Sequence, residues 1–87
     1  MEFDWHDAKH TRNKSERGFG FDFAALIFLG PVLTKQDNRR DYGEVRIKAI
    51  GAAGGRILAV IYTDRGDTRW IISARPANRK ERAQWRA

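Results

Sequence analysis

Two short glycine-centred turns divide the second half of the chain, and they constrain the fold more than any other feature of the sequence. One turn is Gly54-Gly55 and the other is Arg65-Gly66-Asp67. Glycine turns between β-branched and apolar runs are typical of β-hairpins. An earlier strand-like run, at residues 32–35, precedes a polar turn at 37–41. Together with the two glycine turns, it predicts an antiparallel meander of four strands. The predicted strands cover residues 32–35, 44–51, 56–63 and 68–75.

The first half of the chain predicts a short strand and two helices. Polar and apolar residues alternate over 2–5, which is typical of a short edge strand. The segment 7–17 is polar and helix-compatible, and Gly18 can end it in a left-handed cap, so a mostly exposed helix is expected there. A second helix is expected over 22–29, because its first residue can cap it and apolar residues recur at helical spacing before Gly30-Pro31.

The end of the sequence predicts a third helix. Asn78 is followed three residues later by Glu81, which indicates a capping box and a helix reaching about Arg86. Because no linker or repeat divides the sequence, residues 1–87 are expected to form one domain. The expected fold is α+β, with a mainly antiparallel sheet of about four to five strands packed with two N-terminal helices and one C-terminal helix.

The charge balance indicates a polyanionic partner. Seventeen Lys and Arg stand against eleven Asp and Glu, which gives a net charge of +6, and arginine outnumbers lysine. Arginine favours planar, bidentate contacts with phosphates and carboxylates. The alternative is that the charge only keeps a small domain in solution. The absence of cysteine excludes disulfides, a thiolate nucleophile and cysteine-based metal sites.

The sequence also bears on where the protein acts. Its first residues lack the basic segment and apolar run of a secretory signal, and no apolar stretch approaches the roughly 20 residues that cross a bilayer. We therefore expect a cytoplasmic protein that does not bind membranes.

Charged side chains alternate with apolar ones along two of the predicted strands. Glu44, Arg46 and Lys48 form one such row. A second row would share one face of the last strand and consists of Arg69, Ile71, Ser73 and Arg75. If both rows lie on the same side of the sheet, they form a basic surface that could bind RNA, with Arg79 approaching from the last helix. Alternatively, the rows are the solvated face of a half-buried sheet.

Such a surface could cleave RNA without a metal ion or any other cofactor. The reaction needs deprotonation of the 2′-hydroxyl, stabilisation of the phosphorane charge and protection of the leaving oxygen. Lys48 or Glu44 could assist proton transfer, Arg46 and Arg75 could stabilise the phosphate charge, and Ser73 could donate a hydrogen bond.

A metal site is not expected. His6 and His10 are four residues apart and could share a helix face, but no third ligand accompanies them at a recognised spacing. We interpret His6 as a residue at the start of the helix and His10 as an exposed side chain.

Several segments resemble those of the BrnT toxin family, in the same order and with the same spacing along nearly the whole chain. The most specific are the Ile-Ser-Ala-Arg segment and the Glu-Arg pair that follows it. The shared segments include Phe3-x-Trp5, Phe21-Asp22-Phe23-x-Ala25, Gly30-Pro31-Val32, Arg40-Asp41-Tyr42-Gly43-Glu44-x-Arg46, Arg56-Ile57-Leu58-Ala59-Val60, Arg65-Gly66-Asp67, Ile72-Ser73-Ala74-Arg75 and Glu81-Arg82.

The resemblance implies a RelE-like fold, cleavage of RNA that slows translation, and neutralisation by a ribbon–helix–helix antitoxin of the BrnA type. It also implies autoregulation in which operator DNA is reached only through the complex with the antitoxin. The catalytic residues implied are Lys48, Ser73 and Arg75. Arg46 and Arg65 lie near them, and with Arg79 they complete the expected substrate-binding set.

The chain departs from the family pattern at Arg17, which stands before Gly18 where a histidine is common. A histidine there could transfer protons, but the context favours a structural role at the end of a helix. Two alternatives to a ribonuclease remain. The chain could be a non-catalytic basic module that binds protein or nucleic acid, or its charge could serve mainly to contact an acidic antitoxin.

Overall fold

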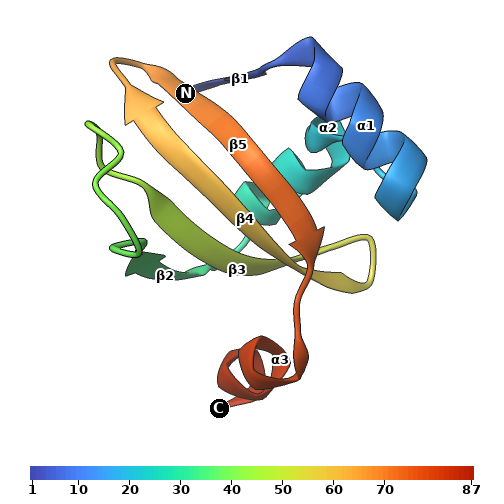
Figure 1. The fold of residues 1–87 in the computed structure, drawn as a ribbon. Coiled ribbons are helices and arrows are strands. Elements are labelled where there is room, and N and C mark those ends of the chain that lie inside the picture. Colours follow the sequence, from blue (N-terminus) through green and yellow to red (C-terminus); the bar gives the residue numbers. More distant parts are fainter.

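The computed structural model describes residues 1–87 as an α+β fold built on one five-stranded sheet (Figure 1). The strand order is β1-β5-β4-β3-β2, with β1 parallel to β5 and every other pair antiparallel. The predicted α+β class and four-stranded meander are confirmed. The elements are β1 (Glu2–Trp5), α1 (Asp7–Arg17), α2 (Phe21–Ala24), the 3₁₀ helix η1 (Ala25–Leu29), β2 (Leu33–Gln36), β3 (Ile47–Ala53), β4 (Arg56–Arg65), β5 (Thr68–Pro76) and α3 (Arg79–Arg86).

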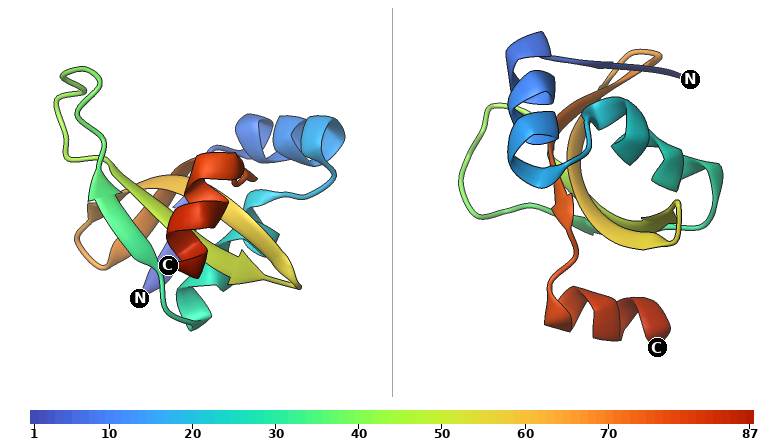
Figure 2. Two further views of the ribbon diagram at one scale, coloured as in Figure 1. Left: turned by 90° about the horizontal axis from the view of Figure 1, so that it is seen from below. Right: turned by 90° about the vertical axis from the view of Figure 1, so that its right-hand side faces the viewer.

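The core lies between the sheet and the segment formed by α2 and η1. These two short helices lie against one face of the curved sheet, whereas α3 lies beyond the end of β5 (Figure 2). The largest fully buried side chains come from both layers. They are Phe21, Ile27, Leu58, Val60 and Ile71. Burial of such side chains stabilises the fold by about 1.5–3 kcal/mol each.

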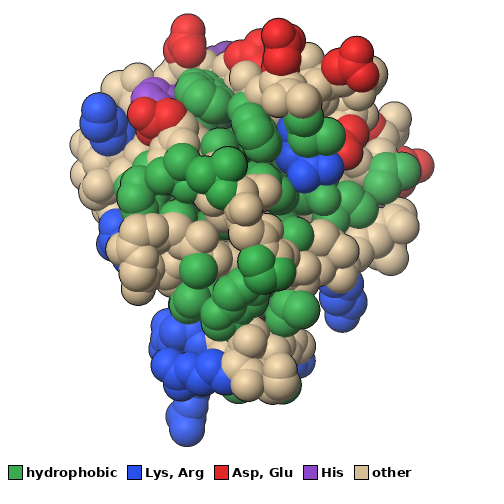
Figure 3. All heavy atoms as spheres, turned by 180° about the vertical axis from the view of Figure 1, so that it is seen from behind, with side chains coloured by type: hydrophobic (Ala, Val, Ile, Leu, Met, Phe, Trp, Pro, Cys, Tyr) green, Lys and Arg blue, Asp and Glu red, His purple; other side chains and the backbone are tan.

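The face seen from behind is largely apolar. Hydrophobic side chains gather across its middle, with acidic side chains along the upper edge (Figure 3). Leu26 and Leu29 of η1 are exposed. None of the helices combines the length and the apolar character that crossing a membrane requires.

The second predicted helix is broken into two short pieces, and Asp22 does not cap it. The residue before α2 is Gly20, which makes no side-chain cap. Instead, Nδ1 of His10 accepts a hydrogen bond from the backbone N–H of Phe21 at 2.9 Å, and the His10 ring stacks on Trp5. His10 is half-buried, so the prediction that it is exposed was wrong; His6 does stand at the start of α1 as predicted.

The third predicted strand begins later than expected, at Ile47, because residues 44–46 close the base of the loop between β2 and β3. The Arg46 carbonyl accepts the N–H of Asp37 at 2.8 Å, and the Val45 carbonyl accepts the hydroxyl of Thr63 at 2.7 Å. This loop projects away from the body of the molecule (Figure 2).

The close approach of η1 to β3 depends on a glycine. A Cβ atom at Gly51 would lie 2.9 Å from Cβ of Ile27 and 3.0 Å from Cγ1 of Val32. We expect Gly51→Ala to lower the free energy of unfolding by about 1–3 kcal/mol, because the helix must move away from the sheet. Urea denaturation measures the change. The control is Gly30→Ala, where the added Cβ meets nothing within 4 Å and stability should not fall.

Candidate functional site

Strand β5 contains a bulge that reverses which residues face each side of the sheet. Ile71 pairs with Tyr62, whereas Ser73 pairs with Ile61, so Ile72 is an extra residue in β5. Neighbouring residues on β4 point to opposite faces. Ile71 therefore faces the core with Tyr62, and Ser73 faces the opposite side with Ile61.

The expected single row on β5 is therefore wrong. Arg69 lies on the core side, with its guanidinium 4.2 Å from the centre of the Tyr62 ring and 4.7 Å from that of Phe28. An extra residue in one strand moves every later side chain to the other face. Because of the bulge, only Ser73 and Arg75 of that row reach the surface that faces away from α2 and η1.

On that surface lies a groove of about 670 Å³. Ser73 lines it, together with one acid, Asp37. Five cations from α1, β2, the loop after β2, β3 and β5 also line it, namely Arg17, Lys35, Arg39, Lys48 and Arg75. The structure therefore brings together the three residues for which the sequence predicted a catalytic role, in strongly basic surroundings.

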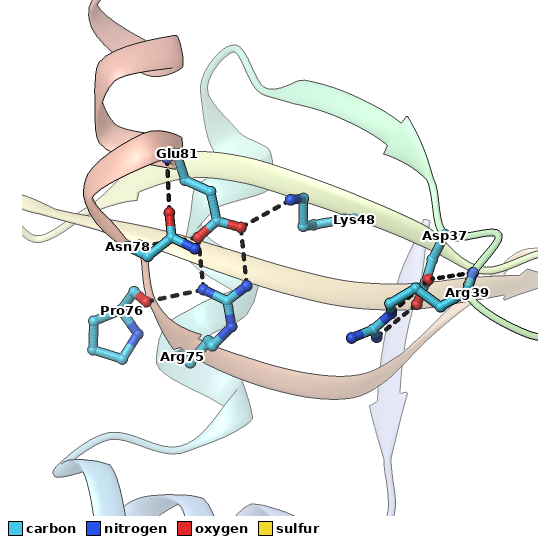
Figure 4. A network of polar contacts seen from close by, with 7 residues as sticks. All are labelled: Asp37, Arg39, Lys48, Arg75, Pro76, Asn78 and Glu81. Carbon is cyan, nitrogen blue, oxygen red and sulfur yellow. Dashed lines mark hydrogen bonds and ion pairs between the residues drawn. The ribbon is translucent and has the colours of Figure 1, made fainter.

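The carboxylate of Glu81 joins two of these cations to α3 (Figure 4). Its Oε1 accepts hydrogen bonds from Nη1 of Arg75 at 2.6 Å and from the backbone N–H of Asn78 at 2.9 Å. Its Oε2 accepts from Nη2 of Arg75 and from Nζ of Lys48, both at 2.9 Å. The Glu81 side chain is only 3% exposed. The predicted capping box is confirmed, because the Asn78 side chain accepts from the N–H of Glu81.

This network sets the pKa of Glu81 and the number of hydrogen-bond donors that Arg75 and Lys48 keep free. The Arg75 guanidinium holds the pKa of Glu81 at about 2, with Asn78 and Lys48 acting in the same direction. Glu81 therefore stays ionised near neutral pH, and its low pKa makes it a poor proton acceptor. Arg75 uses three of its five N–H donors on Glu81 and the carbonyl of Pro76, and Nε–H and one Nη2–H remain. Lys48 likewise keeps two donors beyond Glu81.

Asp37, the acid that lines the groove, is also held by arginine. Asp37 accepts hydrogen bonds from Nε and Nη2 of Arg39 at 2.8 and 2.9 Å, on the side of the groove away from Glu81 (Figure 4). Arg39 lowers the pKa of Asp37 to about 2. Both carboxylates at the groove are thus ionised and paired, and no group of three acidic or histidine side chains is arranged to bind a metal.

The three residues predicted to bind substrate do not line the groove. Arg46 stacks 4.0 Å from the centre of the Tyr42 ring, and its Nε lies 3.5 Å from a Glu44 oxygen without a hydrogen bond. Arg65 donates to Glu44 at 3.0 Å. Arg79 is exposed at the start of α3. Glu44, which the sequence offered as a proton acceptor, is therefore engaged by arginines away from Ser73.

Sequence reasoning missed four residues at the groove. The expected role of Arg17 was confined to the end of a helix, yet it lines the groove. Glu81 was identified only as a helix cap. Lys35 reaches the groove because β2 pairs with β3, and Arg39 reaches it from the loop after β2. The sequence specifies neither that pairing nor the path of the loop. The sequence held one signal for Glu81, namely the Glu-Arg pair that follows the Ile-Ser-Ala-Arg segment. A glutamate six positions after Arg75 can form an ion pair with it.

The pKa of Glu81 makes its contribution to stability dependent on pH. Its ordinary pKa of 4.5 falls to about 2 in the folded state, so the stabilisation is complete above pH 4.5 and is lost as the pH falls toward 2. We expect Glu81→Gln to lower the free energy of unfolding by about 1–3 kcal/mol at pH 7. The difference in free energy of unfolding between the wild type and the variant should decrease below pH 4.5. Urea titrations across this range measure it.

The matched control is Glu16→Gln on the exposed side of α1, where no ion pair is present. That variant should follow the wild type at every pH. A gap for Glu81→Gln that stays constant down to pH 2 would contradict the assigned role of the charge.

Comparison with known proteins gives the family. Residues 5–81 match the family model described as "Ribonuclease toxin, BrnT, of type II toxin-antitoxin system". A search of the curated proteins finds no match. The matched range spans most of the chain and includes the groove residues from Arg17 to Arg75, together with Glu81. The chain therefore belongs to the BrnT family of ribonuclease toxins of type II toxin–antitoxin systems.

Proposed function

We propose that the groove is the active site of a metal-independent endoribonuclease that inhibits translation by cleaving RNA. The observation that carries the proposal is the convergence of Lys48, Ser73 and Arg75 in a basic groove, in a chain of a ribonuclease toxin family. Because Glu81 fixes two of these cations and leaves donors on each, the phosphate site is organised before substrate binds.

In the proposed reaction the 2′-oxygen attacks phosphorus, the bond from phosphorus to the 5′-oxygen breaks, and the products are a 2′,3′-cyclic phosphate and a 5′-hydroxyl. Nε–H and the remaining Nη2–H of Arg75 donate to the phosphoryl oxygens, and the Ser73 hydroxyl adds a third donor. Lys48 transfers a proton to the departing 5′-oxygen and regains one from solvent. The proton of the 2′-hydroxyl passes to solvent, because arginine lowers the pKa of both Asp37 and Glu81 and so makes both carboxylates poor proton acceptors.

The three predicted substrate-binding arginines that lie outside the groove have a different role in this proposal. Arg46 and Arg65 lie beyond it at the base of the β2–β3 loop and at the end of β4, and Arg79 lies at the start of α3. They would contact phosphates farther along the RNA, which adds affinity without base specificity.

The partner in this proposal is a ribbon–helix–helix antitoxin of the BrnA type, and operator DNA is bound only through that complex. Family membership supports an antitoxin and an RNA substrate. Because cellular RNA is the proposed substrate, the proposed place of action is the cytoplasm. The second candidate, a non-catalytic binding module, is favoured by the absence of an unpaired carboxylate or a histidine in the groove.

The deciding experiment is cleavage of purified cellular RNA by the isolated protein in EDTA, with and without its antitoxin. We expect Arg75→Ala to reduce the cleavage rate by about 100-fold or more, because a donor to the developing phosphorane charge is lost. Arg75→Lys keeps a charge beside Glu81 but removes the two-pronged contact, and should give an intermediate rate. Arg12→Ala, an exposed arginine of α1 outside the groove, serves as the control.

Circular dichroism and thermal melting establish that each variant is folded before rates are compared. Cleavage in EDTA that needs Arg75 and stops with antitoxin supports the proposal. RNA that stays intact with folded wild-type protein, although the protein binds it, would favour the binding module. Cleavage that EDTA abolishes would overturn metal independence.

A further inference from the structure

We propose that a second cavity, between β2, β3 and α3, is a subsite for a nucleoside of the RNA strand that neighbours the cleaved phosphate. The inference rests on the proposed function, because it assigns the position of the RNA on either side of the groove. The cavity has a volume of about 380 Å³, within the range of small-ligand sites. It shares Lys35 and Lys48 with the groove, so the two form one continuous surface.

Two consecutive strand pairs make up the floor of this surface. Lys35 lies opposite Lys48, and two residues farther along Leu33 lies opposite Ile50. Residues two apart on a strand share a face and are about 7 Å apart. We call the pair Lys35 and Lys48 the cationic step and the pair Leu33 and Ile50 the apolar step. The cationic step is followed directly by the apolar step, which matches the alternation of phosphate and base along a single strand of RNA.

The two lysines of the cationic step differ in how their charge is compensated. Like charges directly opposite each other in a sheet are destabilising, and an anion paired with one of them relieves this. Lys48 is neutralised by Glu81, but Lys35 has no ion-pair partner. An exposed, uncompensated lysine at the junction of two cavities is suited to bind the phosphate that links two nucleotides.

Helix α3 supplies the wall that faces the apolar step. Lys80 and Gln84 are one turn apart on the same face of α3, and both line the cavity. The Gln84 amide can donate to and accept from the edge of a base, and Lys80 can bind a phosphate. A base would lie on the exposed side chain of Leu33, beside the largely buried Ile50, with its edge toward Gln84 and its phosphate between Lys35 and Lys80.

The test measures binding without cleavage. The probe is a 2′-O-methyl RNA tetranucleotide labelled with fluorescein, together with four versions that each lack one base, and fluorescence anisotropy gives Kd. For the wild type, loss of the base at one position should weaken binding about tenfold. Leu33→Ser should weaken binding of the complete tetranucleotide to a similar extent and should abolish the penalty for losing that base.

Matched controls separate the subsite from general effects. Val45→Ser removes another exposed apolar side chain, 59% exposed against 43% for Leu33, outside both cavities. Lys14→Ala is the control for Lys80→Ala. Both controls should keep the wild-type Kd and the wild-type penalty, whereas Lys80→Ala should weaken binding, and this difference should decrease as salt is raised.

The subsite is overturned if the wild type does not bind the tetranucleotide, if it tolerates the loss of each base, or if Leu33→Ser remains as sensitive as the wild type. Failure of the proposed function gives a different result. In that case unmodified RNA is not cleaved, whereas the pattern of Kd values for the uncleavable probes is unchanged.

Discussion

The carboxylate of Glu81 is the interaction on which the arrangement of the site depends. It caps the first turn of α3, and it holds the guanidinium of Arg75 and the ammonium of Lys48 from two different strands. Most other side chains of α3 are exposed, so little else fixes this helix to the sheet. A single buried anion thereby sets both the geometry of two cations and the position of one wall of the second cavity. Removing one partner of such a pair costs more than the pair contributes.

The distribution of acids explains how a modest net charge becomes a strong local field. Three arginines outside the groove are paired with acids: Arg69 pairs with Asp64, and Arg65 and Arg46 share Glu44. Within the groove, Arg17 and Lys35 have no ion-pair partner. Five cations thus converge on the groove beside only two carboxylates, Asp37 and Glu81. Such a convergence attracts a polyanion more effectively than the same charge spread over the surface.

The sequence predicted what depends on local pattern and missed what depends on register. The hairpin turns, the strand runs and the capping box at Asn78 are encoded by neighbouring residues, and all are present in the structure. The bulge at Ile72 has no local signal, because it arises from how β5 pairs with β4. The grouping of Lys48 with Arg75 was foreseen from charge alternation and family resemblance. The position of Lys35 required the pairing of β2 with β3, which no residue near it specifies.

The pairing of β1 with β5 gives the sheet an order of assembly. Glu2 lies opposite Thr68, so the first strand to be synthesised remains without its neighbour until the last strand has emerged from the ribosome. Contacts so distant along the chain form late, because closing a long loop must precede any gain from pairing. The same delay applies to Arg75 on β5. A nascent chain therefore brings Lys48, Ser73 and Arg75 together in one groove only after β5 has emerged and paired.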